Sequence, residues 1–254
     1  MASKLQRLFV KSRLGRKAEV ELEPAQAHYL INVLRCKTGD QVLLFNGEDG
    51  EWRGAVSGVT KRQASLVVAE QTRPQSEGPD LHYLFAPLKR ARLDYLAQKA
   101  TEMGASLLKP VITRRTVAER VNTDRLKANA VEAAEQCGLL RVPEVRAPEK
   151  LSCVLDAWDP ARVLVFADEA APLASPLEVL SAARHRPLEV LSAARHRPLA
   201  VLIGPEGGFE TEERALLLDQ PFVVPISLGP RVMRADTAAV AALALVNVVL
   251  GDWR

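Results

Sequence analysis

Short apolar runs alternate with helical patterns from residue 80 to the end of the chain. Runs typical of buried strands lie at residues 81–87, 107–112, 162–167, 199–203 and 222–228. Amphipathic or strongly apolar helical patterns lie between and after them, at residues 92–103, 123–138, from about 211 and from about 237. Strands that alternate with helices of this length predict an α/β fold, with a mostly parallel sheet covered on both faces.

The first 75 residues show a different pattern of short strands and tight turns. Strands are expected at residues 7–10, 41–45, 51–57 and 61–68, with a hairpin turn at Asn46-Gly47. A helix is expected from Pro24 to near Gly39. This pattern predicts a small β-barrel or sandwich. The polar stretch 71–80, with two prolines and a glycine, predicts a linker, so we expect domains at residues 1–75 and 80–254.

One segment of the chain is duplicated. Residues 176–186 (PLEVLSAARHR) recur letter for letter at 187–197, and Pro187 breaks any helix that would run through both copies. We interpret this as a local duplication, natural or artefactual, in a connector that needs one copy. One copy is expected to pack as a helix before the strand at 199–203, and the other to loop out, so His185 and His196 are poor catalytic candidates.

Composition adds limits on the class of protein. Charged residues make up 26% and hydrophobic residues 48% of the 254 residues, which is typical of a soluble globular protein. The net charge is +3, but residues 1–73 hold 12 Lys and Arg against 8 Asp and Glu. The first 18 residues carry six basic side chains and no acid, which suits either a polyanion partner or an ordinary solvated terminus.

Cysteine usage and hydropathy bear on location. Three widely spaced cysteines give neither a metal-binding spacing nor a disulfide framework. This favours a reducing cytoplasm and no metal. The longest apolar run, residues 238–250, has 13 residues and includes Asn247, whereas a membrane span needs about 20. We therefore expect a buried or interface helix, no membrane span, and a homodimer that packs on this helix.

The stretch at residues 199–209 is the main candidate for a binding loop. Five apolar residues of a buried strand are followed at once by Gly-Pro-Glu-Gly-Gly-Phe, and Thr211 then opens a helix with acidic residues in its first turn. Glycines allow a ligand to approach the backbone closely. A strand, a glycine turn and a helix form ligand crevices at the carboxyl ends of strands, so we favour a binding loop over an ordinary tight turn.

A second candidate lies at residues 226–240. A strand ends at Leu228, Gly229-Pro230 turns the chain, and Arg231 and Arg234 lie on a short irregular segment. Asp236 or Thr237 is expected to cap the apolar helix that follows. Two arginines beside a glycine turn suit a nucleotide phosphate. In the N-terminal domain, His28 and Arg35 share one helix face and, with Arg7, form a candidate RNA-facing surface, although His28 taken alone better suits a core or capping role.

GPEGGF at 204–209 followed by LGPRVMRADTA at 228–238 resembles the SPOUT methyltransferases. The chain is most similar to the ribosomal RNA small subunit methyltransferase E family, with support from HYLINVLRCKTGD (28–40), FNG (45–47), LDYLAQKATEMGA (93–105) and EAAEQCGLLRVPEV (132–145). The resemblance covers nearly the whole chain. The chain departs from the family at Asp236, where Glu is usual, and at Glu210, where a small hydroxyl residue is usual.

The resemblance implies an N-terminal PUA-like RNA-binding domain, a C-terminal trefoil knot and a homodimer. It also implies methylation of uridine N3 in 16S ribosomal RNA, free or in the assembled small subunit, with S-adenosyl-L-methionine as cofactor. The expected cofactor-binding residues lie on the two glycine turns: Ile203, Gly204, Pro205, Glu206, Gly207, Gly208, Leu228, Gly229, Val232, Met233 and Thr237. The absence of GxGxxG after an early strand and of GxxxxGK[ST] argues against Rossmann-type methyltransferases and NTPases.

The expected chemistry requires the loss of the uridine N3 proton. A base can take this proton, or fixed positive charge can stabilise the resulting anion. Arg234 or Arg231 is the candidate for holding the anion or a phosphate. Glu206 is a possible base, but a bracing role is at least as good. The alternatives are another SPOUT enzyme, such as a ribose 2′-O-methyltransferase, and a non-catalytic RNA-binding assembly factor.

Overall fold

The computed structural model describes residues 5–60, 63–117, 120–184 and 198–253. The chain divides into two compact units, one formed by Met1–Glu77 and Ala134–Val142 and the other by Gly78–Ala133 and Pro143–Arg254. The break after Glu77 falls inside the predicted linker. The sequence placed residues 134–142 in the C-terminal domain, whereas the structure packs them with the N-terminal unit.

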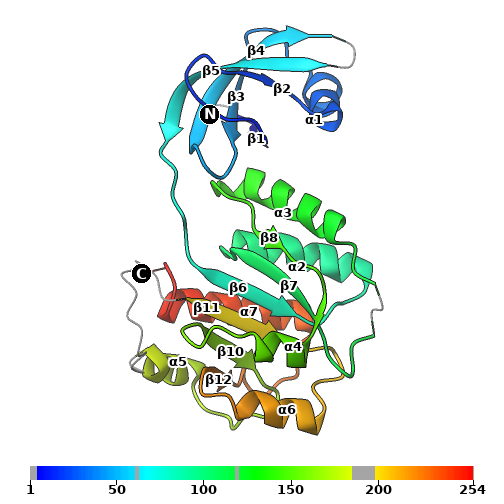
Figure 1. The fold of residues 1–254 in the computed structure, drawn as a ribbon, viewed down its shortest axis with the longest axis vertical. Coiled ribbons are helices and arrows are strands. Elements are labelled where there is room, and N and C mark those ends of the chain that lie inside the picture. The colour runs from blue at the N-terminus through cyan, green and yellow to red at the C-terminus, as the bar shows by residue number, and fades with distance from the viewer. Residues whose placement is uncertain (1–4, 61–62, 118–119, 185–197, 254) are drawn as a thin grey trace. The chain divides into compact units, whose positions relative to one another are not determined.

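The N-terminal unit is built on a five-stranded mixed sheet with the order β1-β3-β4-β5-β2 (Figure 1). The strand β1 pairs in parallel with β3, and all other pairs are antiparallel. The strands are β1 Arg7–Phe9, β2 Glu19–Glu21, β3 Gln41–Phe45, β4 Glu51–Val59 and β5 Ala64–Arg73. Alternate residues of these strands, among them Val42, Leu44 and Leu66, are fully buried in one apolar cluster.

Two local predictions for this unit are corrected. The helix expected from Pro24 to near Gly39 is shorter: α1 covers Pro24–His28, continues as the π-helix η1 Tyr29–Val33, and ends before Arg35, whose φ of 56° is left-handed. Strand β5 runs on to Arg73 and so occupies the start of the predicted linker. The three-residue strand β2 was not predicted, because it is too short to show an alternating pattern.

The C-terminal unit has a parallel sheet with the strand order β12-β10-β11-β6-β7-β8, and β9 also pairs with β7. Every pair in it is parallel, which confirms the predicted α/β class. The strands are β6 Leu81–Phe85, β7 Leu107–Ile112, β8 Glu144–Val145, β9 Glu149–Lys150, β10 Val163–Ala167, β11 Leu199–Ile203 and β12 Val223–Ile226.

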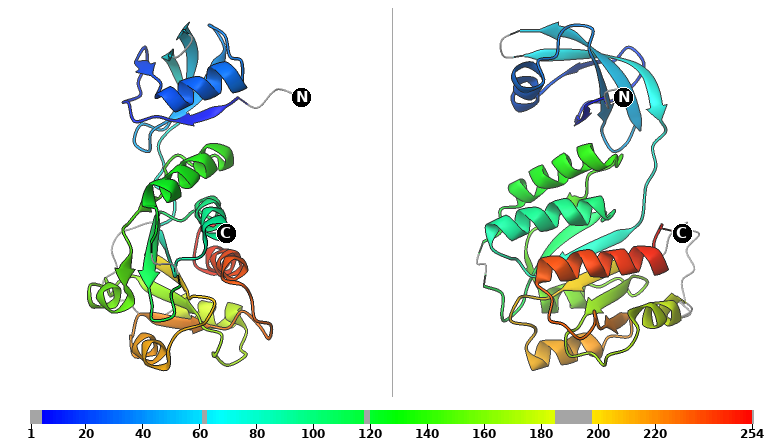
Figure 2. Two further views of the ribbon diagram at one scale, coloured as in Figure 1. Left: turned by 90° about the vertical axis from the view of Figure 1, so that its right-hand side faces the viewer. Right: turned by 180° about the vertical axis from the view of Figure 1, so that it is seen from behind.

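Helices cover both faces of this sheet (Figure 2). Helices α2, α5 and α7 pack together on one face, and α4 and α6 cover the other. The helices are α2 Arg90–Glu102, α3 Thr123–Cys137, α4 Leu151–Asp156, α5 Pro176–Arg184, α6 Thr211–Leu218 and α7 Ala235–Val249. Because β11 is buried from both sides, all five of its residues are apolar.

Two further expectations concern the helices. The residue at the N-cap of α7 is Arg234, without a side-chain cap, so the prediction that Asp236 or Thr237 caps this helix is wrong. Both of these residues lie in its first turn. The first copy of the duplicated segment forms α5, in which Leu180 is fully buried. The second copy, with His196, and His185 at the end of the first copy lie outside the described residues.

Among the described residues, no helix is long and apolar enough to cross a membrane.

Candidate functional site

The two glycine turns meet at one edge of the parallel sheet. Strands β12, β10 and β11 are neighbours and run in parallel, so the loops that follow them leave at the same edge. The three loops enclose a pocket of about 420 Å³. The turns at 204–209 and 228–233 are therefore two walls of the same pocket, although about twenty residues separate them in the sequence.

The first glycine turn has a conformation that excludes larger residues. A Cβ atom at Gly204 would come within 2.4 Å of the Phe209 ring. Gly208 has φ of 70°, and a Cβ there would come within 2.4 Å of the Glu169 carboxylate. The turn is closed by a hydrogen bond of 2.9 Å that the Gly208 amide donates to the Pro205 carbonyl. The backbone of this turn therefore forms part of the pocket wall.

Most of the predicted cofactor-binding residues line this pocket. Nine of them do so, on the loops after β11 and β12: Ile203, Gly204, Pro205, Glu206, Gly208, Leu228, Gly229, Val232 and Met233. Two do not. Gly207 directs its carbonyl to Arg115, which donates a hydrogen bond of 2.7 Å to it, and Thr237 is exposed in the first turn of α7.

The two candidate arginines occupy different places. Arg231 lines the pocket, whereas Arg234 lies at the N-cap of α7 beside the lining. Both side chains are exposed. Among the residues that the structure describes, no carboxylate forms an ion pair with either of them. Two partly solvated cations at the mouth of a pocket are available to an anionic ligand.

The carboxylate of Glu206 is already engaged. It forms an ion pair of 2.5 Å with Arg92 of α2, and both side chains are partly exposed. An arginine partner stabilises the ionised carboxylate and holds it in place. This ion pair supports the bracing role, because it ties the glycine turn to α2 through Oε1 of Glu206.

Three polar residues of the pocket were not assigned to it from the sequence. Asp168 and Glu169 follow β10 directly, and Arg214 comes from α6. Asp168 is almost fully buried and accepts hydrogen bonds of 3.0 and 2.8 Å from Nε and Nη2 of Arg214. The signal for the two acids was their place after a buried strand, the same rule that identified the glycine turn. Nothing comparable marked Arg214.

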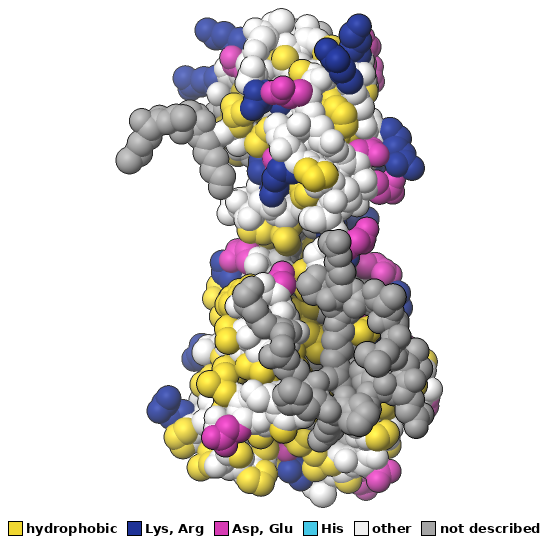
Figure 3. All heavy atoms as spheres, turned by 90° about the vertical axis from the view of Figure 1, so that its left-hand side faces the viewer, with side chains coloured by type: hydrophobic (Ala, Val, Ile, Leu, Met, Phe, Trp, Pro, Cys, Tyr) yellow, Lys and Arg dark blue, Asp and Glu magenta, His cyan; other side chains and the backbone are white. Residues whose placement is uncertain are grey.

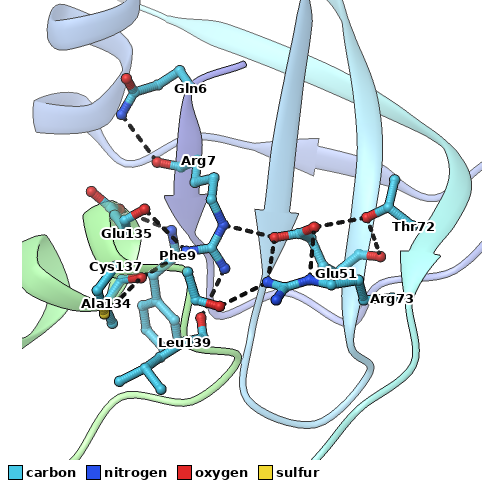
Figure 4. Close-up of polar contacts among 11 residues, drawn as sticks. Gln6, Arg7, Phe9, Glu51, Thr72, Arg73, Ala134, Glu135, Cys137 and Leu139 are labelled. Carbon is cyan, nitrogen blue, oxygen red and sulfur yellow. Dashed lines mark hydrogen bonds and ion pairs between the residues drawn. The ribbon is translucent and has the colours of Figure 1, made fainter. Parts of the chain in front are cut away.

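The third candidate arginine, Arg7, lies inside the N-terminal unit (Figure 4). Only 5% of its side chain is exposed, and its Nε donates to Glu51 at 2.7 Å. Its other nitrogens donate to the carbonyls of Ala134, Glu135 and Leu139 at 2.7 to 3.0 Å. The prediction that Arg7 faces RNA is therefore corrected, because its guanidinium is buried and occupied by partners within the protein.

The remaining N-terminal candidates are on the surface. His28 ends α1 and Arg35 follows η1, and both are exposed. Exposed apolar side chains lie between them, with Tyr29 38% and Val33 58% accessible. Further Lys and Arg side chains project from this unit (Figure 3). An exposed aromatic ring beside cationic groups suits stacking and phosphate contacts with a single-stranded nucleic acid.

Comparison with known proteins gives concordant matches. Residues 76–247 match the RNA methyltransferase domain family, and residues 22–69 match the RNA methyltransferase PUA domain family. The chain is 30% identical to the ribosomal RNA small subunit methyltransferase E of Rickettsia conorii, over 97% of this chain and 96% of the relative. It is 31% identical to the Synechocystis protein of the same name, over 92% of this chain and 74% of that protein.

A solved structure extends the similarity to a ligand-bound protein. A methyltransferase of Legionella pneumophila, in complex with bound S-adenosylmethionine, superposes with a TM-score of 0.82 at 27% identity. The alignment covers 98% of this chain and 100% of that one. The match therefore extends over both units.

Proposed function

The chain belongs to the ribosomal RNA small subunit methyltransferase E family, and from this premise we propose that it transfers a methyl group from S-adenosylmethionine to N3 of one uridine in 16S ribosomal RNA. The observation that carries the proposal is the meeting of the two glycine turns in one pocket at the carboxyl edge of the parallel sheet. The trefoil threading of this region remains a prediction from the resemblance.

The residues of the pocket fit the proposed cofactor. The turns after β11 and β12 present backbone N–H and C=O groups that can hydrogen-bond an adenine edge, and Ile203, Leu228 and Met233 supply apolar surface. Asp168 is paired with Arg214, and the carboxylate of Glu169 adds negative charge to the same pocket, which suits a ligand with cationic sulfonium and ammonium groups. When bound, the cofactor supplies an activated methyl group.

The protein's own contribution to the reaction is electrostatic. Uridine N3 carries a proton at neutral pH, and its loss leaves an anion on the base. Arg234 and Arg231, exposed at the pocket and free of ion pairs among the described residues, are placed to stabilise that anion or to hold the adjoining phosphate. Glu206, paired with Arg92, is assigned to bracing the loop.

We assign recognition of the RNA to the N-terminal unit in part. His28 and Arg35 are its proposed contact residues, on a surface that also exposes Tyr29. The RNA backbone is recognised by charge and the bases by stacking. With ribosomal RNA as the proposed substrate, either free or in the assembled subunit, we expect the protein to act in the cytoplasm.

A homodimer is part of the proposal. The inner face of α7 is buried, yet the outward face is apolar too: Val240, Ala241, Ala244, Leu245 and Val248, of which Val248 is 50% exposed. A helix that is hydrophobic all round is normally covered on all sides. A second copy with the same stripe can cover it around a two-fold axis. A monomer at micromolar concentration in sedimentation would contradict this part.

Two experiments test the function. Isothermal titration with S-adenosylmethionine is expected to give one saturable site per chain, and an absence of heat at millimolar ligand would leave only the RNA-binding alternative. Mass spectrometry of rRNA nucleosides from a deletion strain is expected to show the loss of 3-methyluridine. The loss of a 2′-O-methylated nucleoside instead would identify the other SPOUT activity.

A further inference from the structure

One arginine outside the pocket makes two contacts with the glycine turn. Arg115 lies on the loop that follows β7, and its Nη1 donates to the Gly207 carbonyl at 2.7 Å. Its Nε donates to the carboxylate of Glu210, also at 2.7 Å. The aliphatic part of Arg115 lies against the Cα of Gly207, where a Cβ would be 3.5 Å from Cδ of the arginine. One side chain therefore spans the turn on both sides of Gly208.

The two acceptors have distinct structural roles. The Gly207 carbonyl belongs to the peptide whose N–H, on Gly208, closes the turn onto Pro205. Glu210 is the N-cap of α6 and takes part in a capping box with Glu213. The Arg115 guanidinium beside Glu210 lowers the pKa of that carboxyl. Glu210 is thereby connected both to its own helix and to Arg115.

The position of Arg115 is itself fixed by its loop. Thr113 is buried, and its amide donates to the Thr116 hydroxyl at 2.9 Å in a tight local turn. The neighbouring Arg114 amide donates to Glu213 at 2.8 Å, and the Arg114 side chain pairs with Glu212. These contacts fix the loop after β7, and therefore the position of the Arg115 side chain next to the glycine turn.

We propose that Arg115 is a positioning residue for the pocket, because it fixes the Gly207–Gly208 peptide and the start of α6 through its bonds to the Gly207 carbonyl and Glu210. This inference rests on the proposed function, since it assigns the turn to cofactor binding. Arg115 does not line the pocket, so it acts through the backbone that does. A turn held in its binding conformation loses less conformational entropy when the cofactor binds.

The test is Arg115→Ala in the full-length protein, with S-adenosylmethionine as the probe. Removal of both bonds is expected to raise the Kd and the KM for the cofactor roughly five- to tenfold. The kcat is expected to stay within about twofold and the KM for RNA to stay unchanged, because no group at the reacting atoms is altered. Arg115→Lys keeps the charge but cannot bridge both acceptors, so it should rescue only part of the loss.

Two matched variants separate positioning from general stability. Arg114→Ala removes the neighbouring ion pair without touching the turn and is expected to leave the cofactor Kd unchanged. Glu210→Ser introduces a small hydroxyl N-cap but removes the partner of Arg115, and should raise the Kd only about twofold. The melting temperature of all three cofactor-free proteins should match that of the wild type.

The outcomes are distinct. An equal loss in Arg114→Ala and Arg115→Ala, an unchanged cofactor Kd in Arg115→Ala, or a rise in the KM for RNA alone would each overturn the inference. A fall in melting temperature that accounts for the lost activity would do so as well. If the wild-type protein binds no S-adenosylmethionine, the proposed function fails first, and that result is visible before any variant is made.

Discussion

Arg7 and Arg231 are both single arginines beside a turn or strand end, and the sequence marked both as candidates for a polyanion. In the N-terminal unit, Arg7 is buried and bound to Glu51 and three backbone carbonyls. In the C-terminal unit, Arg231 is exposed at a pocket, without an ion pair among the described residues. The difference teaches that the role of an arginine follows from whether the protein already satisfies its five N–H donors.

The interior of the C-terminal unit offers a second case of the Arg7 kind. Arg162 is 12% exposed and donates to both carboxylate oxygens of Asp80 at 2.8 Å, and also to the Leu199 carbonyl. It lies at the amino-terminal end of the sheet, and the pocket is at the opposite end. Arginines that are largely buried and bonded within the protein thus support the fold in both units, whereas Arg231 is exposed at the pocket and has no ion pair among the described residues.

The largest expected effect is on the buried side of this comparison. Arg7→Ala leaves Glu51 with one arginine fewer and removes donors from the last turn of α3, so we expect a loss of about 3–5 kcal/mol in the free energy of unfolding. Urea unfolding measures it. The matched control is Arg13→Ala, whose side chain is 80% exposed and whose loss should cost less than about 0.5 kcal/mol. Equal losses of unfolding free energy for Arg7→Ala and Arg13→Ala would contradict the structural role of Arg7.

For an exposed arginine at the site, we expect a loss of activity without a loss of stability. Arg234→Ala should lower kcat at least about 100-fold, because a fixed positive charge at the developing anion is lost. The free energy of unfolding should stay within about 0.5 kcal/mol of the wild type, and the cofactor Kd within about threefold. Single-turnover methylation of RNA and titration with S-adenosylmethionine measure the two parts. Near-normal turnover would take Arg234 out of the mechanism, and Arg231→Ala would be the next variant.

A smaller effect is expected beside Arg162. Burial, with a further contribution from the Arg162 charge, lowers the pKa of His82 to about 4. The unfolded chain binds this proton near pH 6.5, so the stability that neutral His82 contributes is complete above that pH and is lost as the pH falls towards 4. At pH 5 the loss should be roughly 1–2 kcal/mol.

His82→Gln is the variant that isolates this group. Unfolding of the variant and of the wild type should be compared between pH 8 and pH 4.5. The variant should lose less stability over this range than the wild type, by about the contribution of His82. Parallel pH profiles of the two proteins would show that other groups cause the acid sensitivity.

The smallest effect is expected for the duplicated segment. Its two copies are identical, so deletion of either gives the same chain, in which one copy can form α5. The deletion should leave the stability within about 0.5 kcal/mol and the methylation rate unchanged. An inactive or unfolded deletion protein would contradict the duplication hypothesis.

The elements that the sequence predicted well are those whose signal is local. The run Leu199–Ile203 is buried from both sides and is bounded by Pro198 and Gly204, so its ends match β11. The turns after β11 and β12 leave the same edge of the parallel sheet, with β10 between them, and the expectation that they meet came from the resemblance carried by the two distant motifs. Asp168 and Glu169 obeyed the same rule, but a pair of acids after a strand is common, and the sequence alone did not distinguish them.

The predictions that failed depend on long-range packing. The backbone carbonyls that accept hydrogen bonds from Arg7 lie at the end of α3, more than a hundred residues later in the sequence. The residues next to Arg7 give no signal of this contact. The cap of α7 was assigned to Asp236 or Thr237 from propensity, but the chain enters the helix earlier, at Ala235. Residues 134–142 were assigned to the C-terminal domain, but they pack with the N-terminal unit for the same reason. The side chains that donate hydrogen bonds to their carbonyls belong to β1 and β5.

The three walls of the pocket are separate connections, each attached to its own strand of a rigid parallel sheet. Substitutions at residues 170–173 leave in place the side-chain contacts of Asp168 with Arg214 and of Glu169 with Gly208, which connect this wall to the glycine turn. Directed evolution could therefore randomise one wall at a time, and a library aimed at cofactor analogues with bulkier alkyl groups can be built stepwise on an unchanged scaffold.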